Sequence, residues 1–240
     1  MTVLNDAASL RLGSQTVARA MLGVNQVWPG PGVVNWALVN QSSVAGNPST
    51  SPITPAIDTT GANFLVAIGC CSGNPGVLAD NRGNTYSPAY VSVAFNSGIR
   101  AMYCRTTNVG PGHLISWNVA FGPLFFLAFS GAPTTVEVAE MHANDASAPS
   151  AVAVGPFTIV KNNTLLVTAF CAPANAPYSL LPGAFTKVAT QNYNISSSLG
   201  GGVGYLIYPS GGPLTSANWV FGGSSSADGT VVLLRIQPGT

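Results

Sequence analysis

Short apolar runs separated by turn-forming residues recur along the whole chain, and this pattern predicts β-strands. The runs are rich in β-branched and aromatic side chains, which favour strands. The chain also contains 27 Gly and 18 Pro, so few windows could hold a helix of ordinary length. Strands at this spacing, with Gly, Pro, Asn and Ser between them, indicate an all-β sandwich or barrel. The clearest runs are 33–39, 64–68, 90–95, 124–129, 164–170, 202–208 and 231–236.

The second half of the chain repeats the first. Asn63–Cys71 aligns with Asn163–Cys171 at an offset of 100 residues, and Trp117 aligns with Trp219 at 102. The final apolar runs continue the same order at an offset of 106. Insertions in surface loops produce a slowly drifting offset of this kind.

We therefore predict two similar copies of about 100 residues each, at about 33–133 and 134–240. Each copy alone is small and has open strand edges, whereas two copies that face each other can bury one common core. The predicted fold is a two-sheet, jelly-roll-like β-sandwich that occupies residues 33–240 as one domain.

Residues 11–30 contain two similar ten-residue segments, RLGSQTVARA followed by MLGVNQVWPG. Each segment contains a glycine, Gly13 or Gly23, at which we expect a turn. This predicts a short β-hairpin-like segment before the sandwich. A piece of this length cannot bury its apolar side chains by itself. We therefore predict that residues 1–32 are a docking segment, which strand addition to a partner would order. The predicted docking interface consists of Leu12, Val17, Leu22, Val27 and Trp28.

Composition narrows the classes of protein. Hydrophobic residues make up 47% of the chain and charged residues only 6%, with a net charge of +1, which argues against nucleic-acid binding. The longest apolar stretch, Val119–Phe129, is interrupted by Gly122 and Pro123, so we expect no membrane span. Asp6 and Arg11 interrupt any signal-peptide core. A surface this poor in charge predicts association with copies of itself or within a larger assembly.

The four cysteines, Cys70, Cys71, Cys104 and Cys171, lack the spacing of a metal site or a disulfide scaffold. We expect them to be small buried side chains in a protein made in a reducing cytosol.

Candidate chemistry is sparse. Glu140, His142 and Asn144 would share one face of a strand and Glu137 the other, an arrangement that lacks a nucleophile and cannot flank a glycosidic bond. A Gly-x-Ser-x-Gly elbow, a His-Glu-x-x-His motif and a P-loop do not occur in the sequence. We predict a solvated polar strand face at His142, no catalytic residues, no metal and no cofactor.

A second polar cluster is Asp80-Asn-Arg-Gly-Asn-Thr-Tyr86. Asp80, Asn81 and Asn84 could offer oxygen ligands to a calcium ion or another ligand, but a bidentate carboxylate is missing. A hairpin turn explains the cluster more simply, because Asp and Asn bond to their own backbone and Gly83 can take a positive φ.

Three tryptophans, Trp36, Trp117 and Trp219, are candidate sugar-binding platforms. Trp117 and Trp219 recur at the same place in the two copies, which suits a role in the core better.

Two segments carry a resemblance to known proteins. Leu12, Gly13, Val17, Leu22, Gly23, Val27, Trp28 and Pro29 resemble the L-G-x-x-x-V … L-G-x-x-x-V-W-P segment of many tailed-bacteriophage structural proteins. Asp80, Gly83, Asn84, Thr85 and Tyr86 resemble the D-x-x-G-N-T-[YW] turn of sandwich domains in phage tail and fibre-like proteins. The second copy lacks this turn, which argues against a ligand shared by both copies.

The resemblance implies a non-enzymatic structural component of a tailed-phage virion, of the tail or another surface appendage, assembled in the host cytoplasm. Its expected partners are other virion proteins and copies of itself, with a trimer favoured. The alternative is a virion protein that recognises a host surface glycan. An enzyme that acts on envelope polysaccharide is a third class.

Overall fold

The structure is a computed structural model. It describes residues 10–12, 15–17, 20–22, 25–28, 35–46, 50–71, 76–92, 98–105, 108–118, 122–133, 135–146, 151–154, 156–172, 178–181, 185–191, 200–209, 212–214, 217–221 and 229–239. For some strand residues, including 140–146, it describes the backbone alone.

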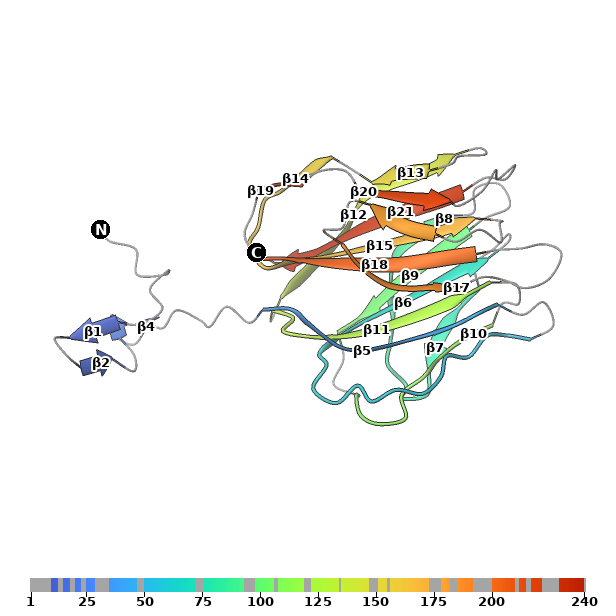
Figure 1. Ribbon diagram of the computed structural model, residues 1–240. Helices are drawn as coiled ribbons and strands as arrows, with labels where there is room; N and C mark the ends of the chain where they lie inside the picture. Colours follow the sequence, from blue (N-terminus) through green and yellow to red (C-terminus); the bar gives the residue numbers. More distant parts are fainter. Residues whose placement is uncertain are drawn as a thin grey trace. The chain divides into compact units, whose positions relative to one another are not determined.

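The chain divides into two compact units, Met1–Val34 and Asn35–Thr240. All regular structure in the described residues is β-strand, in agreement with the predicted all-β class. The larger unit contains two five-stranded antiparallel sheets that stack as a β-sandwich (Figure 1).

The first large sheet comes entirely from the first half of the larger unit. Its strands are β5 (Ala37–Val44), β6 (Phe64–Cys71), β8 (Ser87–Ser92), β9 (Gly98–Cys104) and β11 (Leu124–Ser130). They lie side by side in the order β5-β11-β6-β9-β8.

The second large sheet comes entirely from the second half. Its strands are β12 (Val136–Ala146), β15 (Thr164–Ala172), β17 (Thr186–Gln191), β18 (Gly200–Tyr208) and β21 (Gly229–Pro238). They lie in the order β12-β21-β15-β18-β17.

The two sheets therefore share one strand order: in each, the first strand pairs with the last, the last with the second, the second with the fourth, and the fourth with the third. A register shift also falls at equivalent places, between Pro88 and Tyr90 in β8 and between Lys187 and Ala189 in β17. Such agreement is what an internal duplication predicts, and the duplication itself stays a prediction. The jelly-roll part of the prediction is not confirmed, because each sheet is built from one contiguous half of the chain.

One apolar core joins the two sheets. The first strand of each half packs across from the third strand of the other half, β5 over β17 and β12 over β8. The core includes side chains from both central strands, and these are fully buried. From β6 they are Phe64, Val66, Ile68 and Cys70, and from β15 they are Leu165, Val167, Ala169 and Cys171.

These inward-facing residues correct the alignment predicted from the sequence. The predicted offset of 100 would place Phe64 over Thr164, but Thr164 is not in the shared core and Leu165 is. The offset between the two central strands is therefore 101. A shift of one residue exchanges the two faces of a strand, so this correction reverses which side chains are equivalent.

A layer of loops and short strands covers the outer face of each sheet. On the first sheet, β7 (Leu78–Asp80) pairs with β10 (Ile115–Trp117). On the second half, β13 (Ala151–Val154), β20 (Ala217–Phe221) and β16 (Tyr178–Leu181) form a sheet, and β14 (Phe157–Ile159) pairs with β19 (Gly212–Leu214). Trp117 lies opposite Leu78 and Trp219 opposite Leu180, and both tryptophans are buried, as expected of core residues.

The first residues of the sandwich are fixed to both sheets. Trp36 packs edge-on against Phe64 and Phe129 of the first sheet, with ring centroids 5.3 and 6.3 Å away. Its indole Nε1 donates to the carbonyl of Asn163, directly before β15, at 2.9 Å, and its backbone N–H donates to the Asn163 side chain at 3.3 Å. Asn163 has a φ of 54°, a conformation that asparagine tolerates better than most residues.

The smaller unit contains two short antiparallel hairpins, in agreement with the hairpin-like segment predicted there. β1 (Leu10–Leu12) pairs with β2 (Gln15–Val17), and β3 (Ala20–Leu22) pairs with β4 (Asn25–Trp28). The two hairpins thus nearly coincide with the two ten-residue segments, each hairpin beginning one residue earlier.

Candidate functional site

A dense polar cluster among the described residues of the sandwich is organised by Asp80, at the end of β7. Its Oδ1 accepts the backbone N–H groups of Arg82 and Asn84, both at 3.0 Å, which closes the chain into a turn. Gly83 has a φ of 71°, as predicted. The predicted hairpin is wrong, however, because the strands before and after the turn do not pair with each other. β7 pairs with β10, and β8 pairs with β9.

The second oxygen of Asp80 faces three side-chain donors. Oδ2 accepts hydrogen bonds from Asn84 Nδ2 at 2.6 Å, His113 Nε2 at 3.0 Å and the Tyr86 hydroxyl at 3.1 Å. Burial would by itself raise the pKa of Asp80, but the hydrogen bonds from His113, Asn84 and Arg82 outweigh it and hold that pKa well below its usual range. Burial and the Asp80 charge together raise the pKa of Tyr86. The cluster therefore holds a carboxylate anion beside a neutral phenol.

His113 extends the cluster to a third segment of the chain. Its Nδ1 lies 2.8 Å from the hydroxyl of Thr59, and its ring packs edge-on against Phe126 at 4.9 Å. The Thr59 hydroxyl also accepts the backbone N–H of Gly110 at 3.0 Å. Thr59, His113 and Asp80 have the order of hydroxyl, imidazole and carboxylate found in hydrolases. All three side chains are fully buried, so the hydroxyl is not presented to a substrate, and the arrangement acts as a clamp between three loops.

The roles of His113, Thr59 and Tyr86 are not predicted by the sequence. Histidine 113 lies 33 residues from Asp80 and 54 from Thr59, so no local spacing indicates their contact. The adjacent Gly110-Pro-Gly112 turn was the only local sign that this loop has a fixed backbone.

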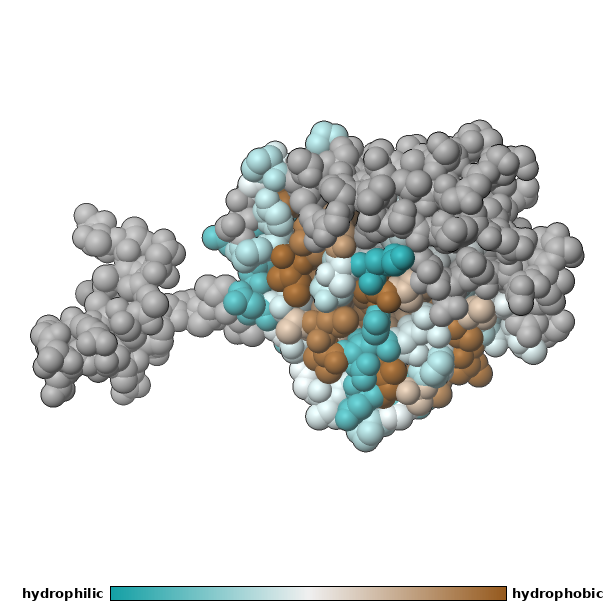
Figure 2. Space-filling model, viewed as in Figure 1, coloured by the Kyte–Doolittle hydropathy of each residue, from teal (hydrophilic) through white to brown (hydrophobic). Residues whose placement is uncertain are grey.

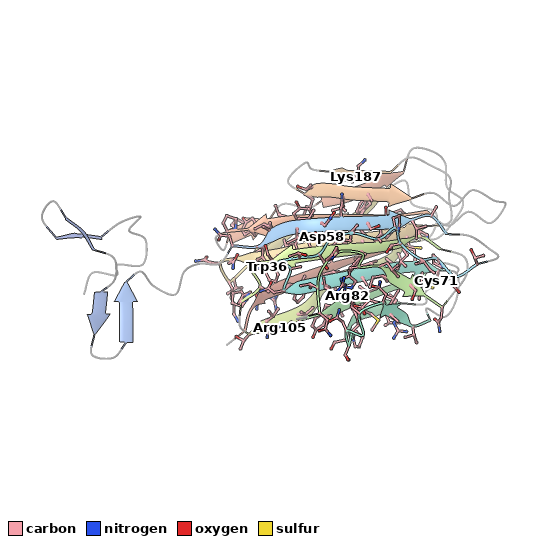
Figure 3. The ribbon with its side chains drawn as sticks, turned by 90° about the horizontal axis from the view of Figure 1, so that it is seen from below. Trp36, Asp58, Cys71, Arg82, Arg105 and Lys187 are labelled. Carbon is pink, nitrogen blue, oxygen red and sulfur yellow. The ribbon has the colours of Figure 1, made fainter. Side chains whose placement is uncertain are left out.

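A shallow, open depression of about 560 Å³ lies beside the Asp80 turn. The Arg82 guanidinium, labelled in Figure 3, donates to the carbonyls of Val109 and Pro111 and so fixes one wall. The depression is lined by Asn81, Arg82, Asn108, Val109, Pro111 and Gly112. On the face seen in Figure 2, hydrophilic and hydrophobic patches of the described surface alternate.

The three residues considered for an ion or ligand, Asp80, Asn81 and Asn84, do lie together. Their polar atoms serve the loops: Asn81 Oδ1 accepts from Leu114 N–H at 3.1 Å, and Asn81 Nδ2 donates to Gly112 at 2.9 Å. A cation at the Asp80 carboxylate would have to displace N–H and O–H donors. In the part of the chain that the structure describes, no group of three or more His, Cys, Asp or Glu side chains could hold a metal ion.

The other polar strand, β12, contains a register shift between Glu140 and His142. The strict alternation on which the predicted shared face depended is interrupted there. The side chains of residues 140–146 lie outside the described residues, so the solvated face at His142 stays a prediction. Glu137, at the start of the strand, accepts hydrogen bonds from Gln237 at 2.8 Å and Arg235 at 3.2 Å.

The predicted docking residues lie on the two hairpins of the smaller unit, where the structure gives the backbone alone. Val17 is paired with Leu10, Leu12 with Gln15, Leu22 with Asn25, and Trp28 with Ala20, whereas Val27 lies at a register shift. Their role in docking stays a prediction.

Searches of protein-family models, curated proteins and solved structures found no match to this chain. No helix among the described residues is long and apolar enough to cross a membrane.

Proposed function

We propose that this protein is a non-enzymatic structural component of a tailed-phage virion, of the tail or another surface appendage, and that residues 1–32 attach it to the particle. The observation that carries the proposal is the division of the chain into a small unit of two hairpins, Met1–Val34, and a sandwich with its own core. An isolated hairpin is marginally stable at best in water. A partner that covers the hairpins would supply the missing stability.

The hairpins suit docking by strand addition. Each presents short strand edges whose backbone groups can pair with another sheet. Trp28 is the proposed anchor, since buried aromatic residues carry a large share of interface energy. The partners are other virion proteins or the same segment of sister chains, in a trimer or another homo-oligomer, assembled in the host cytoplasm.

Incorporation into particles tests this proposal. A chain that starts at Val33 should keep the thermal midpoint of the full chain but be absent from purified virions, as judged by mass spectrometry. Trp28→Ala should reduce incorporation. Val160→Ala, at an exposed valine of the sandwich, is the matched control and should enter particles normally. Normal incorporation of the shortened chain would contradict the proposal.

A second candidate function, recognition of a host surface glycan, is favoured by the open depression at Asn81, Arg82 and Asn108. Amide and guanidinium groups are common partners of sugar hydroxyls. Binding of the full chain to purified host surface glycans, with loss in Arg82→Ala and Asn108→Ala, would support this candidate. Unchanged binding in both variants would exclude this depression.

A further inference from the structure

Two cysteines from equivalent positions of the two sheets meet in the shared core. Cys70 is the second-last residue of β6, and Cys171 is the second-last residue of β15. Both side chains are fully buried, and both belong to the core that joins the sheets. β6 and β15 are the central strands of their sheets, so a bond between these two positions would join the middle strands of the sandwich.

The sheets approach closely at this point. Cα atoms of β6 and β15 come within 8 Å, whereas stacked sheets usually lie about 10 Å apart. Cys70 Sγ lies 3.5 Å from the carbonyl oxygen of Phe170, which belongs to the peptide group that leads into Cys171. Gly201 leaves room for the Cys70 side chain, because a Cβ atom at position 201 would lie only 2.7 Å from Cys70 Sγ.

Cys70 also affects the pKa of Cys171. Burial raises the pKa of Cys171 and the neighbouring Cys70 raises it further, which outweighs the lowering by the backbone N–H groups of Cys71 and Gly98. All four cysteines are free thiols in this structure. A thiol whose pKa is raised reacts slowly, so Cys171 is expected to stay reduced through folding in a reducing cytosol.

We propose that Cys70 and Cys171 are a covalent cross-link site, which closes to an inter-sheet disulfide when the folded protein meets an oxidant of the peroxide class. One sulfur, as thiolate, attacks the peroxide and becomes a sulfenic acid with release of water. The other sulfur then attacks the sulfenic sulfur, and a second water leaves. In total, two S–H bonds are broken, one S–S bond forms, and the peroxide is reduced to two waters. Both side chains are fully buried, so the oxidant, a small neutral molecule, reaches the pair through local opening of the fold.

The cross-link would join the two halves of the sandwich across a loop of about 100 residues. A disulfide that closes a loop of this size restricts the unfolded chain strongly. For a protein of this length, we expect the thermal midpoint to rise by about 5–10 °C. Antibody domains have a comparable inter-sheet disulfide.

The other two cysteines are built-in controls. Cys71 and Cys104 belong to the separate apolar cluster on the outer face of the first sheet. Figure 3 shows Cys71 toward the end of the sandwich opposite Trp36. Burial raises the pKa of Cys71 to about 12, so it too is expected to react slowly.

The test uses the full chain, purified in reductant and then exposed, still folded, to hydrogen peroxide. After denaturation, an alkylating agent labels the remaining thiols, and intact mass counts them. Of four thiols, two should be lost together, peptide mapping should join Cys70 to Cys171, and the thermal midpoint should rise until a reductant reverses it. Persistence of all four thiols, oxidation to sulfinic acids without a cross-link, or a link to Cys104 would each overturn the proposal.

Substitutions of the cysteines test whether the cross-link joins Cys70 to Cys171. In Cys71→Ala/Cys104→Ala, both remaining thiols should disappear on oxidation without formation of a covalent dimer. If that double variant does not fold, Cys104→Ala alone should lose two of its three thiols. Cys70→Ser should abolish the rise in thermal midpoint, and Cys104→Ser should keep it. A rise that survives in Cys70→Ser would also overturn the proposal.

Discussion

The outer faces of the two sheets carry a buried tryptophan at equivalent positions, but the surroundings of the two rings differ. Trp117 lies directly over Gly69, where a Cβ atom would come within 2.5 Å of the ring. Trp219 lies beside Phe170, the equivalent of Gly69, with ring centroids 6.0 Å apart. The same strand order thus accommodates a tryptophan either by removing a side chain beneath it or by adding an aromatic ring beside it.

The polar ends of the two tryptophans differ in the same way. Trp219 Nε1 donates to the hydroxyl of Thr168 at 3.1 Å, and that hydroxyl donates to the carbonyl of Val232 at 3.0 Å. Ala67 occupies the position equivalent to Thr168, and Trp117 Nε1 is buried without a hydrogen-bond partner among the described residues. Equivalent backbones therefore do not impose equivalent side-chain interactions, since each outer layer is packed by its own loops.

The largest expected loss of stability comes from removing the aromatic ring that packs beside Trp219. Phe170→Ala removes the ring beside Trp219 and leaves a cavity, so the free energy of unfolding should fall by about 3–5 kcal/mol. Urea unfolding measures the loss, and Val160→Ala at the surface is the control. A loss below about 1 kcal/mol would show that the loops collapse into the space.

The reciprocal change fills the first site. Gly69→Ala forces a methyl group into the Trp117 ring, so the free energy of unfolding should fall by about 1–3 kcal/mol. Near-ultraviolet circular dichroism should show a changed tryptophan signal. Ala79→Ser, at an exposed position of β7, should leave both quantities unchanged.

A smaller effect is expected from the hydroxyl beneath Trp219. Thr168→Val keeps the side-chain shape but leaves Trp219 Nε1 without its acceptor, at a loss of about 1–2 kcal/mol by chemical denaturation. Thr186→Val, at an exposed position of β17, should change stability by less than about 0.5 kcal/mol. Equal losses in the two variants would show that the hydrogen bond contributes little.

The smallest expected effect is a loss of stability as the pH falls from neutral, and it should affect the first half of the sandwich before the second. The pKa of Asp80 is lowered in the folded protein, so its carboxylate stabilises the fold above the unfolded pKa of about 3.9, and this contribution is lost as the pH falls below that value. The loss should reach only about 0.3 kcal/mol at pH 4 and grow by about 1.4 kcal/mol for each further pH unit.

The second half has Pro182 at the equivalent sequence position, so hydrogen exchange should increase first around the Asp80 turn. Asp80→Asn should remove this part of the acid sensitivity. An unchanged pH profile in that variant would contradict the role of Asp80.

The central strands could be predicted from the sequence because both of their faces are buried, which produces continuous apolar runs such as Phe64–Ile68. The same feature explains the error of one residue in the alignment of the two halves. A run that is apolar at every position has no alternation, so it does not indicate which side chains face the other sheet. The edge strand β5 begins and ends later than the predicted run 33–39, because its Asn, Gln and Ser residues do not form an apolar run.

One part of the candidate site could likewise be predicted from the sequence, and another part could not. The Asp80 turn could be predicted because three of its donors, Arg82, Asn84 and Tyr86, lie within six residues along the chain. The clamp by His113 and Thr59 depends on loops that meet only in the folded protein, and the sequence offers no period or spacing to reveal them. The predicted hairpin is wrong because the strands on either side of the turn belong to different sheets.

The attachment of Trp36 has a mechanical consequence. The segment before Asn35 joins the sandwich where the Trp36 ring is held by Phe64 and Phe129 of one sheet and by Asn163 at the start of the other. Tension applied to the N-terminal hairpins is therefore transmitted to both layers at once, instead of peeling the edge strand β5 from its neighbour. A joint of this kind resists a pull by shearing several contacts together, so rupture should require greater force than the successive opening of single hydrogen bonds.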